Sequence, residues 1–200
     1  MEPIDVAHDI TAVILAGGQG RRMGQTDKGL LTLAGRPFIE HVIARIRPQI
    51  PRLALNSYAP EDYRRYGLPV FTDAIAGGLG PLAGLHAALT HCDSQWVLTL
   101  PCDTPLLPTD LVSRMVESVE REQRDVCTVS DGQRLHAVII LANKKVLPRL
   151  ESFLNSGQRR VQDWLAGEQP AIADFSDTPD AFINLNTPEQ LTKLEKELCP

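Results

Sequence analysis

Short apolar runs recur along the chain, and most of them end at a glycine or a small polar residue. The clearest run is Ile10–Leu15, which is rich in β-branched residues and is followed by Ala16, Gly17 and Gly18. Short continuous runs of this kind are typical of strands that are buried on both faces of a sheet. We expect further strands at residues 52–56, 68–72, 96–100, 125–130 and 137–141.

Helical periodicity occupies the stretches between several of these runs. In residues 37–47, Phe38, Val42 and Ile46 fall on one stripe, and Pro37 stands in a first-turn position. Residues 82–91 and Leu111–Glu122 show a similar period. Strands and helices that alternate in this way indicate right-handed crossovers and a largely parallel sheet with helices on both faces.

The whole chain, residues 1–200, is therefore expected to form one three-layer α/β/α domain, with residues 1–9 as an N-terminal tail. No repeat and no low-complexity linker divides the sequence. The part after Ser130 is less regular. We expect it to add an antiparallel strand and elements that face the substrate.

Composition narrows the class of protein. An apolar fraction of 43% and a charged fraction of 22% are those of an ordinary globular protein, and a net charge of −5 argues against nucleic acid or an anionic membrane as the main partner. The N-terminus is acidic and has no apolar run, and no segment approaches the length of a membrane span, so we expect a cytoplasmic protein. The four cysteines form no C-x-x-C pair, which favours reduced thiols over a zinc site. They are Cys92, Cys102, Cys127 and Cys199.

Polar residues and glycines stand at the ends of four expected strands. Open parallel sheets bind ligands outside the carboxyl ends of their strands. Any one of these residues could be a turn residue, because Asn and Asp are favoured in turns, but their joint placement favours a ligand site. They are Gly17 and Gly18 after the first strand, Asn56 at the end of the second, and Asp73 and Asp103 after the third and fourth.

The loop after the first strand has the composition of a triphosphate-binding loop. Its glycines let backbone N–H groups approach an anion closely, and Arg21, Arg22 and Lys28 add cations to an acidic chain. A P-loop is excluded because Lys28 lies between Asp27 and Gly29. The dinucleotide fingerprint also fails, because the third glycine falls at position 24 instead of 23.

The motif Leu15-Ala-Gly-Gly-x-x-x-Arg22-Met-Gly-x-x-Asp-Lys28 resembles the signature of the nucleotidyltransferases that activate sugars and cofactors. Further pieces in the same order make the chain most similar to the molybdenum cofactor guanylyltransferases. This resemblance implies a Rossmann-like nucleotidyltransferase fold and transfer of GMP from GTP to molybdopterin, with release of pyrophosphate. The further pieces begin at Gly80 (GPLAG), Pro101 (PCDTP), Gly157 (GQRRV) and Asn184 (NLNTPEQL).

The resemblance also implies roles for individual residues. Arg22 and Lys28 would hold the triphosphate, and Asp103 would bind Mg²⁺, a hard cation that prefers carboxylate oxygen. The alternative for Asp103 is a turn or capping residue. Other residues would contact the guanine base and the ribose, namely Leu15, Ala16, Gly17, Gly18, Asn56 and Asp73.

The acceptor side is less determined by the sequence. Arg159 and Arg160 could bind the pterin phosphate, or they could form a solvated basic turn. Asn184 and Asn186 are expected to face the acceptor or the metal, since helix capping by the following Thr-Pro-Glu-Gln leaves both unexplained. His136 is expected to be a satisfied core or edge residue.

Three alternatives remain open at this point. The first is the same chemistry with CTP or with a sugar phosphate; Gly17 and Gly18 favour GTP, because cytidylyltransferases of this superfamily tend to have Ala-Ala-Gly there. The second is a non-catalytic nucleotide-binding protein, which we would expect to lack Arg22, Lys28 or Asp103. The third is a module that passes the cofactor between proteins. The resemblance implies transient contacts with other proteins of molybdenum cofactor assembly.

Overall fold

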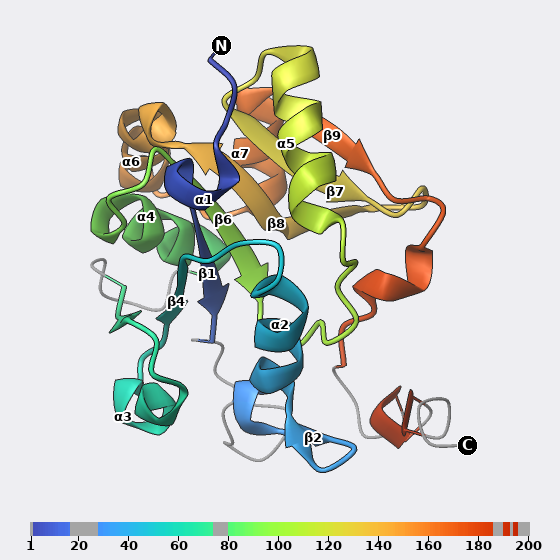
Figure 1. The fold of residues 1–200 in the computed structure, drawn as a ribbon. Coiled ribbons are helices and arrows are strands. Elements are labelled where there is room, and N and C mark those ends of the chain that lie inside the picture. Colours follow the sequence, from blue (N-terminus) through green and yellow to red (C-terminus); the bar gives the residue numbers. More distant parts are fainter. Residues whose placement is uncertain (1, 17–27, 74–79, 186–189, 193, 196–200) are drawn as a thin grey trace.

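A seven-stranded sheet forms the centre of the molecule in the computed structural model, which describes residues 2–16, 28–73, 80–185, 190–192 and 194–195 (Figure 1). The strand order is β5-β4-β1-β6-β8-β7-β9. Every neighbouring pair is parallel except the two pairs that β8 makes, which are antiparallel. The mostly parallel sheet is therefore confirmed, and β8 is the antiparallel strand expected after Ser130. The strands are β1 (Ile10–Leu15), β4 (Leu53–Asn56), β5 (Val70–Phe71), β6 (Trp96–Pro101), β7 (Val126–Ser130), β8 (Leu135–Asn143) and β9 (Ala171–Asp174).

Helices cover both faces of this sheet, which makes the three layers that the sequence predicts. On one face, Val42 and Met115 belong to the same core cluster as Ile14 of β1. On the other face, Leu85 and Trp164 belong to a cluster with Val13 of β1. Successive residues of a strand point to opposite faces, so the apolar run of β1 supplies both cores. The first face carries α2 (Phe38–Ile46) and α5 (Leu111–Glu122), and the second carries α4 (Pro81–His91), α6 (Leu147–Asn155) and α7 (Val161–Glu168).

Part of the expected N-terminal tail is folded. Residues Val6–Asp9 form the helical turn α1, whose first turn is capped by the side chain of Asp5. Ile4 donates its N–H to the Glu120 carboxylate at 2.8 Å and packs against the core of the first face. The remaining short elements are β2 (Thr32–Leu33), β3 (Arg36–Pro37), α3 (Pro60–Tyr63) and the 3-10 turns η1 (Lys28–Leu30), η2 (Arg64–Tyr66), η3 (Lys144–Val146) and η4 (Pro179–Phe182).

The chain changes direction across the sheet between β1 and β6. From β1 it passes to β4 and β5 on one side, and it then returns through α4 to β6 on the other side (Figure 1). Leu15 at the end of β1 lies in register with Asn56 of β4 and with Pro101 of β6. We call the side of the sheet on which these strands finish the carboxyl edge. Open α/β sheets bind their ligands at such a switch point.

Three cysteines are buried and free, as the sequence led us to expect, while Cys199 lies outside the described residues. Burial raises the pKa of the Cys92 thiol to about 11 and that of the Cys127 thiol to about 12. Both groups are therefore protonated and unreactive near neutral pH. No helix in the described part of the chain has both the length and the apolar character needed to cross a membrane.

Candidate functional site

Lys28 and Asp103 meet at the carboxyl edge, although 75 positions separate them in the sequence. Asp103 comes two residues after β6, and Lys28 begins η1. The Lys28 ammonium donates to Oδ2 of Asp103 at 3.1 Å. The side chains are 24% and 11% exposed, respectively, so the pair is partly covered but still reachable from solvent. The two residues predicted to hold phosphate and metal are thus brought together.

The loop that carries Asp103 is held by a distant segment of the chain. The backbone carbonyl of Asp103 accepts a hydrogen bond from the N–H of Leu185 at 3.1 Å. Thr104, which is buried, donates its hydroxyl to the side-chain oxygen of Asn184 at 2.7 Å. Leu185 is anchored in a small apolar cluster with Phe38. Asn184, which was predicted to face the acceptor or the metal, therefore lies beside the loop of the predicted metal ligand.

Asn56 and Asp73 form a second polar group at the same edge. The buried Asn56 amide donates to Oδ1 of Asp73 at 2.9 Å and makes a longer contact of 3.5 Å with the carbonyl of Phe71. The Tyr58 hydroxyl donates to Oδ2 of the same Asp73 carboxylate. The sequence predicted Asn56 and Asp73 but missed Tyr58. Its position two residues beyond the end of β4 is the signal that could have found it.

The end of β1 is joined to this second group through the backbone. The N–H of Ala16 donates to the carbonyl of Asn56 at 2.8 Å, and Ala16 is fully buried. A Cβ added at Gly84 of α4 would lie 2.8 Å from a methyl group of Leu15 and 3.4 Å from the side-chain oxygen of Asn56. The absence of a side chain at position 84 therefore lets α4 approach Leu15 and Asn56 closely. Leu15 and Ala16 thus lie beside Asn56 at the carboxyl edge, and their role in base binding stays a prediction.

The two arginines predicted to bind the acceptor make local contacts in the loop between α6 and α7. The Arg159 guanidinium donates to the backbone carbonyls of Leu154 and Gln158, which closes the end of α6. Arg160 is 77% exposed and lies 3.8 Å from Asp163. These contacts agree with the basic-turn alternative for Arg159, and the role of both residues in acceptor binding stays a prediction.

Four of the predicted site residues, Gly17, Gly18, Arg22 and Asn186, lie outside the described residues. In the described part of the chain, no group of three or more His, Cys, Asp or Glu side chains is arranged to hold a metal ion.

His136 is a partly buried residue with a side-chain partner, as expected of a satisfied edge residue. Its Nε2 lies 2.8 Å from Oδ2 of Asp131, and its ring packs on Phe182 with 4.7 Å between centroids. Burial opposes ionisation of Asp131, but the backbone N–H groups of Arg134 and Gln133 and the His136 ring outweigh it and lower the Asp131 pKa to about 2. This carboxylate belongs to the turn between β7 and β8.

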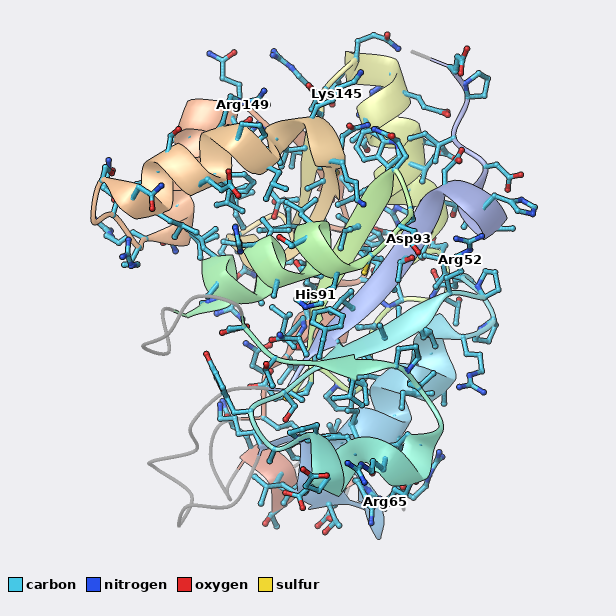
Figure 2. The ribbon with its side chains drawn as sticks, turned by 90° about the vertical axis from the view of Figure 1, so that its left-hand side faces the viewer. Arg52, Arg65, His91, Asp93, Lys145 and Arg149 are labelled. Carbon is cyan, nitrogen blue, oxygen red and sulfur yellow. The ribbon has the colours of Figure 1, made fainter. Side chains whose placement is uncertain are left out.

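The side of the sheet on which the strands begin offers a contrast to the carboxyl edge. Asp93 precedes β6 and Arg52 precedes β4, and Figure 2 shows the two close together at that side. Both residues are exposed. They provide charged positions before the same two strands, on the side of the sheet opposite the carboxyl edge.

Comparison with known proteins places this geometry in a family. Residues 12–172 match the family model described as a MobA-like NTP transferase domain. The chain is 44% identical over 195 residues to a molybdenum cofactor guanylyltransferase of Shewanella pealeana, covering 97% of this chain and 98% of the relative. It is also 44% identical over 190 residues to the enzyme of the same name from Shewanella amazonensis, covering 94% and 97% of the two chains.

Solved structures support the fold. The crystal structure of molybdopterin-guanine dinucleotide biosynthesis protein A from Archaeoglobus fulgidus superposes with a TM-score of 0.78 at 20% identity, covering 94% of this chain and 98% of that chain. A 4-diphosphocytidyl-2C-methyl-D-erythritol synthase from Anaerococcus prevotii superposes with a TM-score of 0.70 at 14% identity, covering 96% and 97%. The expected Rossmann-like nucleotidyltransferase fold is confirmed. Because the second protein is named for a cytidyl product, the fold by itself does not select the base.

Proposed function

This chain belongs to the MobA-like NTP transferase family, and we propose that it transfers GMP from GTP to molybdopterin, forming the guanine dinucleotide cofactor and pyrophosphate. The relatives at 44% identity carry the name of that activity over nearly their full length. The structural observation that best supports the proposal is the 3.1 Å contact between Lys28 and Asp103 at the switch point of the sheet. It brings the cation predicted to bind phosphate and the carboxylate predicted to bind the metal to one place.

In the proposed reaction, a phosphate oxygen of the pterin attacks the α-phosphorus of GTP. A new phosphorus–oxygen bond forms there while the bond to the β-phosphate oxygen breaks, and pyrophosphate leaves with that electron pair. A phosphate nucleophile is already ionised near neutral pH, so no side chain has to remove a proton. The protein's task is to align the two phosphates and to neutralise the developing charge. Lys28 is placed to do the second, with Arg22 as its predicted partner.

We propose that Asp103 binds Mg²⁺. A magnesium ion in nucleotide enzymes takes one or two carboxylates and draws its other ligands from phosphate oxygens and water. A carboxylate beside a cation that can move to the phosphates fits this pattern, and the described residues hold no group of three or more His, Cys, Asp or Glu side chains arranged around a metal. When bound, the metal supplies positive charge against the phosphate oxygens. Asp103 orients it, and the contacts of Thr104 and Leu185 hold the Asp103 loop.

The second polar group favours guanine over cytosine as the base. Guanine presents two adjacent N–H donors on its Watson–Crick edge, which a carboxylate such as Asp73 can accept together. Cytosine presents one amino donor beside an acceptor nitrogen, which a carboxylate repels. A site that offers two acceptor oxygens therefore selects guanine over cytosine in two ways, because it attracts the guanine donors and repels the cytosine ring nitrogen. Asn56 adds a side-chain oxygen near Leu15 and Gly84.

The acceptor side remains a prediction from the sequence. Asn184 is supported by its position beside the Asp103 loop, whereas Arg159, Arg160 and Asn186 rest on the family resemblance. We also propose, from that resemblance, transient contacts with other proteins that assemble the cofactor, in the cytoplasm.

A nucleotide panel tests the proposed function. The purified protein is mixed with Mg²⁺, molybdopterin and each of GTP, CTP, ATP and UTP, and pyrophosphate and the dinucleotide product are measured. We expect both products with GTP, in equal amounts, and little of either with the other three. Pyrophosphate with CTP instead would replace the guanylyl assignment by the cytidylyl alternative. Tight GTP binding without pyrophosphate would favour a non-catalytic nucleotide-binding protein.

A further inference from the structure

Tyr58 combines an exposed ring with a hydroxyl that is bound to the site. Its side chain lies at the carboxyl edge beside Asp73 and is one of two large hydrophobic residues that the described surface exposes, at 48%. An exposed tyrosine is ordinarily free to move, but this hydroxyl donates to Oδ2 of Asp73. None of the roles assigned above requires this contact. We therefore asked what it does to the Asp73 carboxylate.

The backbone fixes the position from which Tyr58 reaches Asp73. The buried Ser57 donates its N–H to the carbonyl of Phe71 at 3.0 Å, which extends the pairing of β4 with β5 by one residue. The Ser57 hydroxyl then accepts the N–H of Ala59 at 3.1 Å, a local turn that leads into α3. Tyr58 stands between these two contacts. The backbone on both sides of Tyr58 is thus held by hydrogen bonds. The contact between its hydroxyl and Asp73 therefore does not require a long loop to become ordered.

The two donors on Asp73 leave it with a defined acceptor pattern. A carboxylate has about four lone-pair sites, two on each oxygen. Asn56 occupies one site on Oδ1 and Tyr58 occupies one site on Oδ2. Among the described residues these are the donors to Asp73, so an acceptor site is left on each oxygen, and the adjacent N1–H and N2–H donors of guanine require one acceptor on each.

We propose that Tyr58 is a positioning residue for base selection, which orients the Asp73 carboxylate so that both of its remaining acceptor sites face the guanine edge. This inference rests on the proposed use of GTP and adds a residue that determines its specificity. A neutral donor suits the task, because it fixes the carboxylate without cancelling its charge. Burial, followed by the bond to Asp73, raises the Tyr58 pKa to about 12, so the phenol remains a donor throughout the working pH range.

The test is Tyr58→Phe, which removes the hydroxyl and keeps the ring. Equilibrium dissociation constants for GTP and CTP are measured with Mg²⁺ on the full chain, together with kcat and KM for the transfer. We expect the Kd and KM for GTP to rise about fivefold. The lost hydrogen bond to the Asp73 carboxylate affects GTP only through the orientation of that carboxylate, so the change should be smaller than for a hydrogen bond made to GTP itself. The Kd for CTP and the kcat should stay unchanged. Tyr66→Phe is the matched control, because the Tyr66 hydroxyl bonds to Arg65 and not to Asp73.

A double-mutant cycle separates positioning from any other effect of the hydroxyl. In an Asp73→Asn background, Tyr58→Phe should have no further effect on GTP binding, because the carboxylate that it orients is gone. Equal fivefold losses in both backgrounds would overturn the inference. So would tighter GTP binding by Tyr58→Phe, since the hydroxyl would then compete with the base. If the unchanged protein binds GTP but transfers nothing, the proposed function fails and the Tyr58 comparison still stands; if it binds no GTP, both fail.

Discussion

Asp73 and Asp103 lie at the same edge of one sheet, yet the protein holds them in opposite ways. Asp103 is paired with the ammonium group of Lys28, so its charge is balanced by a cation. Asp73 is held by the amide of Asn56 and the hydroxyl of Tyr58, which are both neutral donors. The two groups are built from different strands, with Asp103 after β6 and Asp73 after β5. The difference is one of chemistry and not only of position.

A carboxylate beside a movable cation can exchange that cation for a metal while Lys28 turns to the phosphates. A carboxylate held by neutral donors keeps its full charge and a fixed direction, which suits reading of a base. We infer that substitutions in the Lys28–Asp103 group act mainly on kcat, whereas substitutions around Asp73 act mainly on nucleotide affinity and choice. The following predictions test that division.

The largest effect is expected from Asp103→Ala. If Asp103 holds the metal as proposed, its removal should lower kcat by about a thousandfold or more while the protein stays folded. Turnover is followed by pyrophosphate release, and folding by circular dichroism and thermal melting. Asp93→Ala, at an exposed residue that precedes β6 on the opposite side of the sheet, should keep full activity. Full activity in Asp103→Ala would remove the metal assignment.

Lys28→Met should come next, with kcat lowered by about a hundredfold, because one cation is lost from the developing charge of the leaving pyrophosphate. The ratio of GTP to CTP affinity should not change. Lys145→Met is the control, since Lys145 is an exposed lysine on η3, remote from the carboxyl edge (Figure 2). A large shift in base selectivity in Lys28→Met would contradict the division between the two groups.

Asp73→Asn should raise the Kd for GTP about 30-fold, which is the loss expected when hydrogen bonds to a charged group are removed. The amide keeps the shape of the side chain but replaces one acceptor oxygen by a donor. Binding of CTP should improve, because the repulsion of its ring nitrogen is relieved. Both constants are measured by equilibrium binding with Mg²⁺. Unchanged discrimination between GTP and CTP would show that the base is read elsewhere.

The smallest effect on activity is expected from Asp131→Asn, which removes a buried carboxylate that serves the fold. Its Oδ1 accepts the backbone N–H groups of Gln133 and Arg134, each at 2.8 Å. Their weakening should cost about 1–2 kcal/mol of unfolding free energy at pH 7, with kcat and Kd unchanged. Urea denaturation measures the difference, and activity assays of the same variant provide the comparison with Asp73 and Asp103.

The pH dependence of this difference has a defined sign. The folded-state pKa of Asp131, about 2, lies below the ordinary value of 3.8, so ionised Asp131 stabilises the fold above pH 4. That contribution is lost as the pH falls from about 4 towards 2. The gap in stability between the unchanged protein and Asp131→Asn should therefore narrow over this range. A gap that stays constant down to pH 3 would contradict the assignment.

The strands and helices with a strong periodic signal were predicted well from the sequence. The ranges Ile10–Leu15 and Leu111–Glu122 match β1 and α5 as observed. The meeting of Asn56 with Asp73 was also predictable, because parallel strands deliver their ends to one edge. Each of these features depends on local pattern and on the general rules of open parallel sheets.

The elements after β8 were not predicted, for identifiable physical reasons. α6 and α7 are nine and eight residues long, and α6 has a proline in its first turn, so each presents only about two turns of pattern. β9 has four residues, two of them alanine, which carry little β-propensity. Tyr58 was missed because its place just after β4 marks only the edge of the sheet, and no local pattern records that its hydroxyl contacts Asp73, which is 15 positions away.

The reversed direction of β8 has a further consequence for how this scaffold can vary. Because β7 returns directly through β8, a tight hairpin takes the place that a crossover helix would occupy beside β6. The turn between Asp131 and Leu135 can then gain or lose residues without any rearrangement of a helical layer. Related chains can thus reshape the flank next to β6 while β1 and β4 keep their alignment. An engineer who wishes to admit a larger second substrate should begin at this hairpin.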